Sequence, residues 1–182
     1  MVITMKVQML LAGFGGQGIL FMGKVAAATA MIDGKYVSWL PSYGPEMRGG
    51  TANCSVCIDE REIGCPIVLS PSLFVAFNRP SFEKFIGAVQ PGGTALADSS
   101  LIDLPCLRED LQFCPIPATG LAQQNNLNGL ANMIMLGYLT KVSGFTSLKT
   151  LRQAVQNSVP ASKAQMLEKN LEAISLGYEF AG

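Results

Sequence analysis

A glycine-rich turn near the start of the chain constrains the fold more than any other feature. It lies between a short apolar run, Val7 to Ala12, and an apolar stretch over 19–32 that predicts a helix, and it reads Gly13-Phe14-Gly15-Gly16-Gln17-Gly18. A strand, a glycine turn and a helix in this order leave backbone N–H groups free at a helix N-terminus, where phosphates and other anions bind. The sequence therefore predicts that an anion-binding site includes Gly15, Gly16, Gln17 and Gly18.

A second glycine-rich segment follows the next predicted strand, Lys35–Leu40, and it reads Pro41-Ser42-Tyr43-Gly44-Pro45-Glu46-Met47-Arg48-Gly49-Gly50-Thr51. Arg48 is its one strong cation, and a planar guanidinium suits a phosphate or carboxylate of a ligand or of a partner chain. The alternative is that Arg48 pairs with Glu46 and orders the loop. If the two loops follow neighbouring strands, they form one crevice, and its further site residues are Tyr43, Glu46, Met47, Arg48, Gly49 and Gly50.

Strand patterns and helix patterns alternate along the chain. The predicted strands are Val7–Ala12, Lys35–Leu40, Thr51–Ile58, Leu73–Asn78, Thr94–Ala97 and Leu111–Ile116, and the predicted helices cover 18–32, 82–89, 129–139, 147–155 and 160–174. The first strand, helix and second strand predict a right-handed, parallel βαβ unit. We expect one domain over 1–182 with an α/β fold: an open, mostly parallel, Rossmann-like sheet covered by helices on both faces. Asn125, Asn128 and Asn132 are expected to share one face of the buried helix.

The low charge of the chain bears on its partners. Only 14% of the residues are charged, and 13 acidic residues balance 13 basic ones. No basic run is present, which argues against nucleic acid, and no apolar run reaches the length of a membrane span. So few charges favour a surface that is covered by other subunits, although a compact domain with a weakly charged surface is the alternative. Lys6 lies inside the first apolar stretch, which indicates a first strand in a cytoplasmic protein and not a signal peptide.

The sequence also limits the chemistry. The chain has no histidine, which excludes Ser-His-Asp and Cys-His catalysis and the common zinc sites. Cys54 and Cys57 form a CxxC pattern, but it lies in a predicted strand, where residues three apart point to opposite faces. We therefore expect no catalytic residue and no metal ligand in this chain, and we interpret the cysteines as small buried side chains.

Two familiar nucleotide motifs are incomplete. The pattern Gly13-x-Gly15-x-x-Gly18 fits a dinucleotide fold, but an NAD site needs an acid at the end of the second strand, near 39–41, where none is found. Asp33 precedes that strand. The spacing of Gly18, Gly23 and Lys24 imitates a P-loop, but Val25 stands where a Ser or Thr must bind Mg²⁺. An NAD-dependent oxidoreductase therefore remains the least favoured function.

The two glycine segments together resemble the gamma subunit of 2-oxoacid:ferredoxin oxidoreductases. The likeness extends through Ile63-Gly64-Cys65-Pro66, Asn132-Met133-Ile134-Met135-Leu136-Gly137 and the stretch from Asn170 to Gly177. The resemblance implies a part in a complex that oxidatively decarboxylates a 2-oxoacid to an acyl-CoA and CO₂ and reduces ferredoxin. It also implies that thiamine diphosphate and the iron–sulfur clusters are held by partner subunits, the thiamine-binding and ferredoxin-like chains.

The resemblance further implies that this chain contributes part of a coenzyme A (CoA) pocket, with Gln17 and Gly18 in the first loop and 46–48 in the second. The pyruvate enzymes of the family have lysines where this chain has Glu46 and Met47, so Arg48 is expected to supply the positive charge. The alternative is an interaction subunit whose loops bind only protein. The isolated chain is expected to self-associate through the face that its partners cover, and branched-chain 2-oxoacids or 2-oxoglutarate are the expected substrates of the complex.

Overall fold

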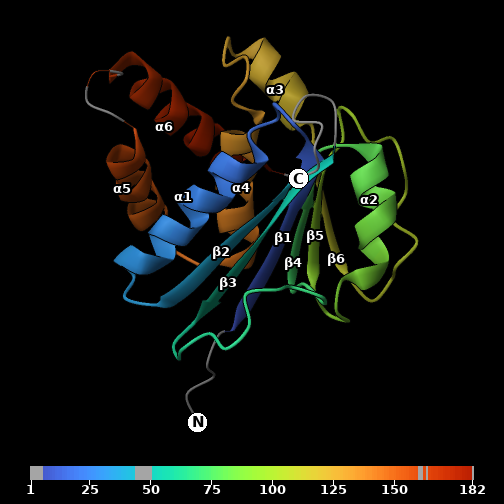
Figure 1. Cartoon of the computed structure of the whole chain (residues 1–182). Helices are drawn as coiled ribbons and strands as arrows, with labels where there is room; N and C mark the ends of the chain where they lie inside the picture. Colours follow the sequence, from blue (N-terminus) through green and yellow to red (C-terminus); the bar gives the residue numbers. More distant parts are fainter. Residues whose placement is uncertain (1–5, 44–50, 160–161, 163, 182) are drawn as a thin grey trace.

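The computed structural model describes residues 6–43, 51–159, 162 and 164–181, which form one six-stranded sheet with helices on both of its faces (Figure 1). The elements in chain order are β1 (Val7–Phe14), α1 (Ile19–Ile32), β2 (Tyr36–Tyr43), β3 (Thr51–Asp59), β4 (Leu73–Ala76), α2 (Arg79–Phe85), a short 3₁₀ helix η1 (Ile86–Ala88), β5 (Thr94–Asp98), β6 (Gln112–Ile116), α3 (Ala118–Gln124), α4 (Ala131–Ser143), α5 (Leu148–Ser158) and α6 (Ala164–Glu179). The α/β fold with an open, mostly parallel sheet is thereby confirmed. None of the described helices is long and apolar enough to cross a membrane.

The strand order is β2-β3-β1-β4-β5-β6, and β3 runs antiparallel to both of its neighbours. β1 and β2 point in the same direction, as the βαβ pattern predicts, but the expectation that they are neighbouring strands is wrong. The reason lies in the connection between β2 and β3. Residues 44–50 are too few for a crossover to a parallel strand, so β3 turns back as the second arm of a hairpin and enters the sheet between β1 and β2.

The hairpin nevertheless brings the second glycine segment to the first. At the end of β2, Tyr43 is paired with Ala52, and Ala52 is paired with Gly13 on the other side. Thr51 is paired with Phe14 in the same ladder. Both ends of the segment 44–50 are therefore attached within the sheet next to the glycine turn. The residues that flank segment 44–50 are held near the glycine turn by β3, which pairs with both β1 and β2.

The sheet separates two apolar cores. One face packs against α1, α3, α4, α5 and α6, and the other is covered by α2 and by the segments around it (Figure 1). Cys54 lies in the first core and Cys57 in the second, so the prediction that these two side chains point to opposite faces is confirmed. Burial in the first core raises the pKa of the Cys54 thiol to about 12, which makes it an unreactive apolar side chain.

Helices α4 and α6 cross at two glycines. A Cβ added to Gly177 would overlap the carbonyl oxygen of Ile134, and one added to Gly137 would overlap the carbonyl oxygen of Ile174. The obstacle is backbone in both cases, so no side-chain rotation relieves it. This close approach fixes α4 against α6, and it thereby positions the N-terminal end of α4 beside the glycine turn.

Replacing Gly177 by alanine is therefore expected to destabilise the protein by about 3 kcal/mol, at the upper end of the usual cost of overpacking a core. The matched control is Gly87→Ala, because a Cβ at Gly87 meets no atom within 4 Å. Urea unfolding, monitored by circular dichroism, measures the stability of both variants. Equal midpoints for the two variants would contradict the close helix crossing.

Candidate functional site

The glycine turn connects the end of β1 to the start of α1 through two residues with positive φ. Gly16 has a φ of 97° and Gly18, the N-cap residue of α1, has a φ of 76°. Glycine adopts these angles without the steric cost that other residues incur. Among the described residues, no backbone carbonyl accepts a hydrogen bond from the N–H groups of Gly16 and Gly18. The turn thus has the donor geometry that the sequence predicts for an anion site.

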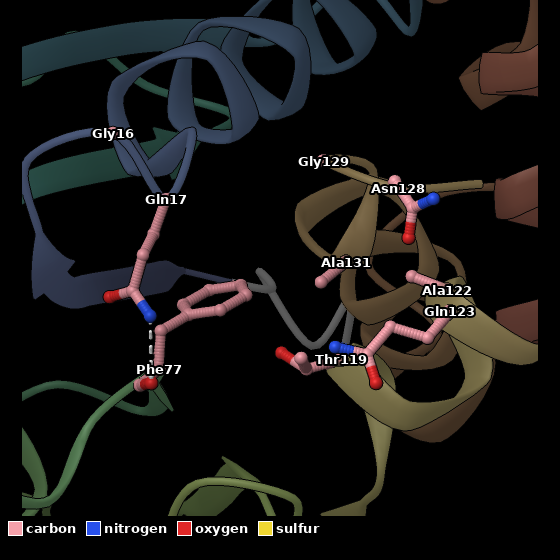
Figure 2. Close-up of a pocket in the computed structure, with 9 residues that line it drawn as sticks. All are labelled: Gly16, Gln17, Phe77, Thr119, Ala122, Gln123, Asn128, Gly129 and Ala131. Carbon is pink, nitrogen blue, oxygen red and sulfur yellow. Dashed lines mark hydrogen bonds between the residues drawn. The ribbon is translucent and has the colours of Figure 1, made fainter. Parts of the chain in front are cut away.

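The side chain of Gln17 holds this turn to the sheet. Its Oε1 accepts a hydrogen bond from the Phe14 N–H at 2.6 Å and one from Asn78 Nδ2 at 3.4 Å, and its Nε2 donates to the Phe77 carbonyl at 3.1 Å. Phe77 directly follows β4, so one amide joins the ends of β1 and β4 (Figure 2). Gln17 therefore has a structural role that the sequence does not indicate, and one Nε2 proton remains for a ligand.

Asn132, in the first turn of α4, contacts the other side of the glycine turn. Its Nδ2 donates to the Gly18 carbonyl at 3.2 Å, and a Cβ on Gly18 would collide with the Asn132 side chain. The residue is only 4% exposed, and its Oδ1 is buried without a hydrogen-bond partner among the described residues. The expectation that Asn125, Asn128 and Asn132 share one helix face is wrong. Asn125 ends α3 and Asn128 lies in the turn before α4.

Helix α3 lies across from the glycine turn, and a buried carboxylate holds its first turn. Asp98 is fully buried at the end of β5, and it accepts hydrogen bonds from the Thr119 N–H at 3.1 Å and from Thr119 Oγ1 at 2.5 Å. Ser100 Oγ accepts one from the Gly120 N–H at 3.0 Å. These side chains do for α3 what an N-cap residue does for an ordinary helix. Because Asp98 and Ser100 satisfy these N–H groups, the start of α3 is not free to bind an anion.

A cavity of about 210 Å³ separates the glycine turn from α3 and the start of α4 (Figure 2). Gln17 and Phe77 face it from one side, and Thr119, Gln123 and Asn128 from the other. The described residues that line it are Gly16, Gln17, Phe77, Thr119, Ala122, Gln123, Asn128, Gly129 and Ala131. Amides, one hydroxyl and apolar groups therefore form the walls.

The chemistry of this lining favours binding over catalysis. None of the nine described residues that line the cavity is ionisable, so none of them can transfer a proton near neutral pH. Amide and hydroxyl groups can hold the polar but uncharged part of a ligand, and the free backbone N–H groups of the turn can hold an anionic part.

The structure brings together some of the predicted site residues. Gly16 and Gln17 line the cavity, while Gly15 and Gly18 lie in the same turn. Tyr43 ends β2, and Ala52 of β3 lies between it and Gly13 at the start of this turn. The other predicted site residues, Glu46, Met47, Arg48, Gly49 and Gly50, lie outside the described residues.

The α3 wall of the cavity was not foreseen from the sequence. Thr119, Gln123 and Asn128 lie on α3 or in the turn that follows it, where the sequence predicts no helix. The helix is short and begins after Pro117, and its stabilising carboxylate lies 21 residues earlier in the chain. The one local sequence signal for α3 is Pro117, which immediately precedes the helix.

Replacing Gln17 by alanine is expected to lower the free energy of unfolding by about 1–3 kcal/mol, because the Phe14 N–H loses its buried acceptor and the strand ends lose their link. Gln123→Ala is the matched control, since Gln123 lines the same cavity but is exposed. The Gln123→Ala substitution should change the free energy of unfolding by no more than about 0.5 kcal/mol. Chemical denaturation measures both, and a Gln17 variant as stable as the control would show that the amide link is unimportant.

The amino-acid sequence of the chain matches a known protein family. The model of the pyruvate ferredoxin/flavodoxin oxidoreductase family matches residues 8–180. The 2-oxoglutarate synthase subunit KorC of Methanocaldococcus jannaschii is 35% identical over 98% of this chain and 96% of its own length. The ketoisovalerate oxidoreductase subunit VorA of Methanothermobacter marburgensis is 37% identical over 97% of this chain, which spans only 37% of that longer protein.

Two solved structures share the fold. The gamma subunit of a keto/oxoacid ferredoxin oxidoreductase from Geobacter sulfurreducens PCA is 27% identical, with a TM-score of 0.81 over 95% of this chain and 96% of that one. The 2-oxoglutarate:ferredoxin oxidoreductase of Magnetococcus marinus, solved with 2-oxoglutarate, coenzyme A and succinyl-CoA bound, is 26% identical with a TM-score of 0.83. The match covers 94% of this chain but 30% of that one. From the family match over 8–180 and the end-to-end likeness to KorC, the chain belongs to the pyruvate ferredoxin/flavodoxin oxidoreductase family.

Proposed function

We propose that the chain, as one gamma-type domain over 1–182, is a subunit of a multi-subunit 2-oxoacid:ferredoxin oxidoreductase. Such a complex oxidatively decarboxylates a 2-oxoacid to an acyl-CoA and CO₂ and passes the electrons to ferredoxin. The observation that carries the proposal is the end-to-end match to KorC, together with a cavity whose described lining residues include no ionisable side chain. In this proposal the chain contributes binding surface to the complex, and the partner subunits contain the catalytic groups.

The partners in this proposal are a thiamine-binding subunit and a ferredoxin-like subunit. Thiamine diphosphate and the iron–sulfur clusters are assigned to them, because within the described residues no three His, Cys, Asp or Glu side chains gather as metal ligands would. VorA and the Magnetococcus enzyme support shared assembly, since in both a longer polypeptide contains the region that matches this chain. The complex is proposed to work in the cytoplasm, and the isolated chain to self-associate.

The ligand proposed for the cavity is part of coenzyme A, which supplies the thiol that accepts the acyl group. The Magnetococcus enzyme was solved with coenzyme A and succinyl-CoA bound, and this chain shares its fold at 26% identity. Coenzyme A carries an uncharged arm rich in amides and hydroxyls, and the walls of the cavity present amides and a hydroxyl to such an arm. The residues present therefore fit this part of the molecule.

The phosphates of coenzyme A need N–H donors and positive charge in addition to the amides and the hydroxyl that line the cavity. The backbone N–H groups of Gly16 and Gly18 suit one anionic group, since they lie at the start of α1. Arg48 is proposed to supply the missing positive charge, with Tyr43, Glu46, Met47, Gly49 and Gly50 shaping the rest of the pocket. The attachment of segment 44–50 next to the glycine turn supports this assignment.

A second candidate function is an interaction subunit without a small-molecule site. Gln17 favours it, because most of the hydrogen-bonding capacity of its amide is used inside the protein. The low charge of the chain favours extensive protein contacts, and so do exposed apolar side chains on the edge strand β2 and at the end of α1, namely Tyr36, Trp39, Leu40 and Met31. The two functions differ in whether substitutions in the cavity change the binding of coenzyme A.

The CoA assignment predicts that Arg48→Ala in the assembled complex raises the KM for coenzyme A roughly tenfold or more, since a charge-assisted hydrogen bond contributes about 1.5–3 kcal/mol. Asn128→Leu, which places an apolar side chain at the cavity wall, is expected to raise the same KM. The control is Arg61→Ala, because Arg61 is exposed just beyond β3, at the opposite end of the sheet from the glycine turn. Steady-state kinetics at saturating 2-oxoacid measure all three.

Assembly is checked by size-exclusion chromatography of each variant complex. Unchanged coenzyme A kinetics for Arg48→Ala and Asn128→Leu, with assembly intact, would remove the ligand from this cavity. Loss of co-purification for either variant, with unchanged kinetics in the complex that survives, would favour the interaction subunit.

A further inference from the structure

A second cavity, of about 120 Å³, lies at the end of the sheet remote from the glycine turn, and two cysteines line it. It is bounded by the start of β1, the end of β3 and the segment after β3, which crosses the lower edge of the sheet in Figure 1. The cysteines are Cys57, on β3, and Cys65, in the segment that follows. Nothing in the proposed function uses either thiol.

The two cysteines differ in exposure but are close together. Cys57 is 2% exposed and Cys65 is exposed at the surface. The Sγ of Cys57 lies 3.9 Å from the carbonyl oxygen of Cys65 and 3.8 Å from that of Pro66. The buried thiol therefore points directly at the backbone that carries the exposed one.

The backbone around Cys65 has room to move so that the Cys65 sulfur reaches the Cys57 sulfur. Residues 60–72 contain no helix or strand, so no ladder of hydrogen bonds fixes their path. Gly64, the neighbour of Cys65, has no atom within 4 Å of the position where a Cβ would lie. A change of the Cys65 rotamer with a small shift of this segment can bring the two sulfur atoms to bonding distance, without disturbing β3.

We propose that Cys57 and Cys65 form a dithiol site that hydrogen peroxide oxidises to an intramolecular disulfide. The exposed Cys65 thiol attacks one peroxide oxygen, which gives a sulfenic acid at Cys65 and one water. The Cys57 sulfur then attacks the Cys65 sulfur, the S–O bond breaks, and a second water leaves with the Cys57 proton. Two thiols lose two electrons and two protons, and one peroxide is reduced to two waters.

The other cysteines lack this arrangement. Cys54 and Cys114 lie in the core on the opposite face of the sheet, and burial raises the pKa of both thiols. Cys106 is half-buried, and its Sγ lies 3.9 Å from the Arg108 carbonyl oxygen. Cys54 is thus an internal control, since it lies on the same strand as Cys57 and faces away from Cys65.

The test treats the purified full chain with stoichiometric hydrogen peroxide and then blocks the remaining thiols with iodoacetamide. The expected result is a loss of 2 Da from the intact mass before alkylation, three alkylated cysteines when the alkylation is carried out in denaturant, and a Cys57–Cys65 link located by tandem mass spectrometry. The closed loop should raise the melting temperature by roughly 5 °C, and dithiothreitol should reverse the shift.

Cys65→Ser is the principal variant, because an exposed serine leaves the fold intact. It should retain a free Cys57 thiol after peroxide and show no shift in melting temperature, while Cys106→Ser should behave as the wild type. Cys57→Ala removes the resolving thiol with little change in volume, and one equivalent of peroxide should then leave Cys65 as a sulfenic acid, which a second equivalent oxidises to a sulfinic acid. Wild-type protein whose Cys65 gains oxygen while Cys57 stays free, or a link through Cys54, would overturn the proposal.

Discussion

One side-chain amide holds together the region on which the candidate site depends. Gln17 accepts from the Phe14 N–H and donates to the Phe77 carbonyl, so it closes the glycine turn and ties the ends of β1 and β4. Without this link, the turn would have to present its free N–H groups from a flexible loop, and ordering that loop around a ligand would cost conformational entropy. The amide thus preorganises the turn, which is the condition for tight binding of an anionic group.

The opposite wall of the cavity depends on a contact between distant parts of the chain. Asp98 fixes the first turn of α3, and Asn132 joins the start of α4 to the Gly18 carbonyl. Each is a polar group in a buried place that is hydrogen-bonded to backbone, an arrangement that specifies position more than it adds stability. The walls are therefore set by the sheet and the two helices, and Asp98, the ionisable group in these contacts, supports α3 without lining the cavity.

The sequence predicts those features that depend on local patterns. The glycine turn, the six strands and the opposite orientation of Cys54 and Cys57 follow from turn chemistry and from strand alternation, and all are confirmed. The position of β3 between β1 and β2 is not local, because a strand pattern carries no information about its neighbours. Helix α3 was missed for a related reason, since Asp98, which caps it, is remote in sequence. The structural role of Gln17 was hidden as well, because an amide in a glycine turn fits a ligand contact equally well.

Hydrogen–deuterium exchange of the assembled complex, with and without saturating coenzyme A, measures whether the ligand enters this cavity. We expect coenzyme A to slow exchange in peptides that cover the glycine turn, 15–19, and the α3–α4 wall, 118–131, while peptides over 57–65 at the far end of the sheet stay unchanged. Protection confined to the partner subunits, with 15–19 and 118–131 exchanging equally fast in both states, would contradict the claim that this cavity receives the ligand.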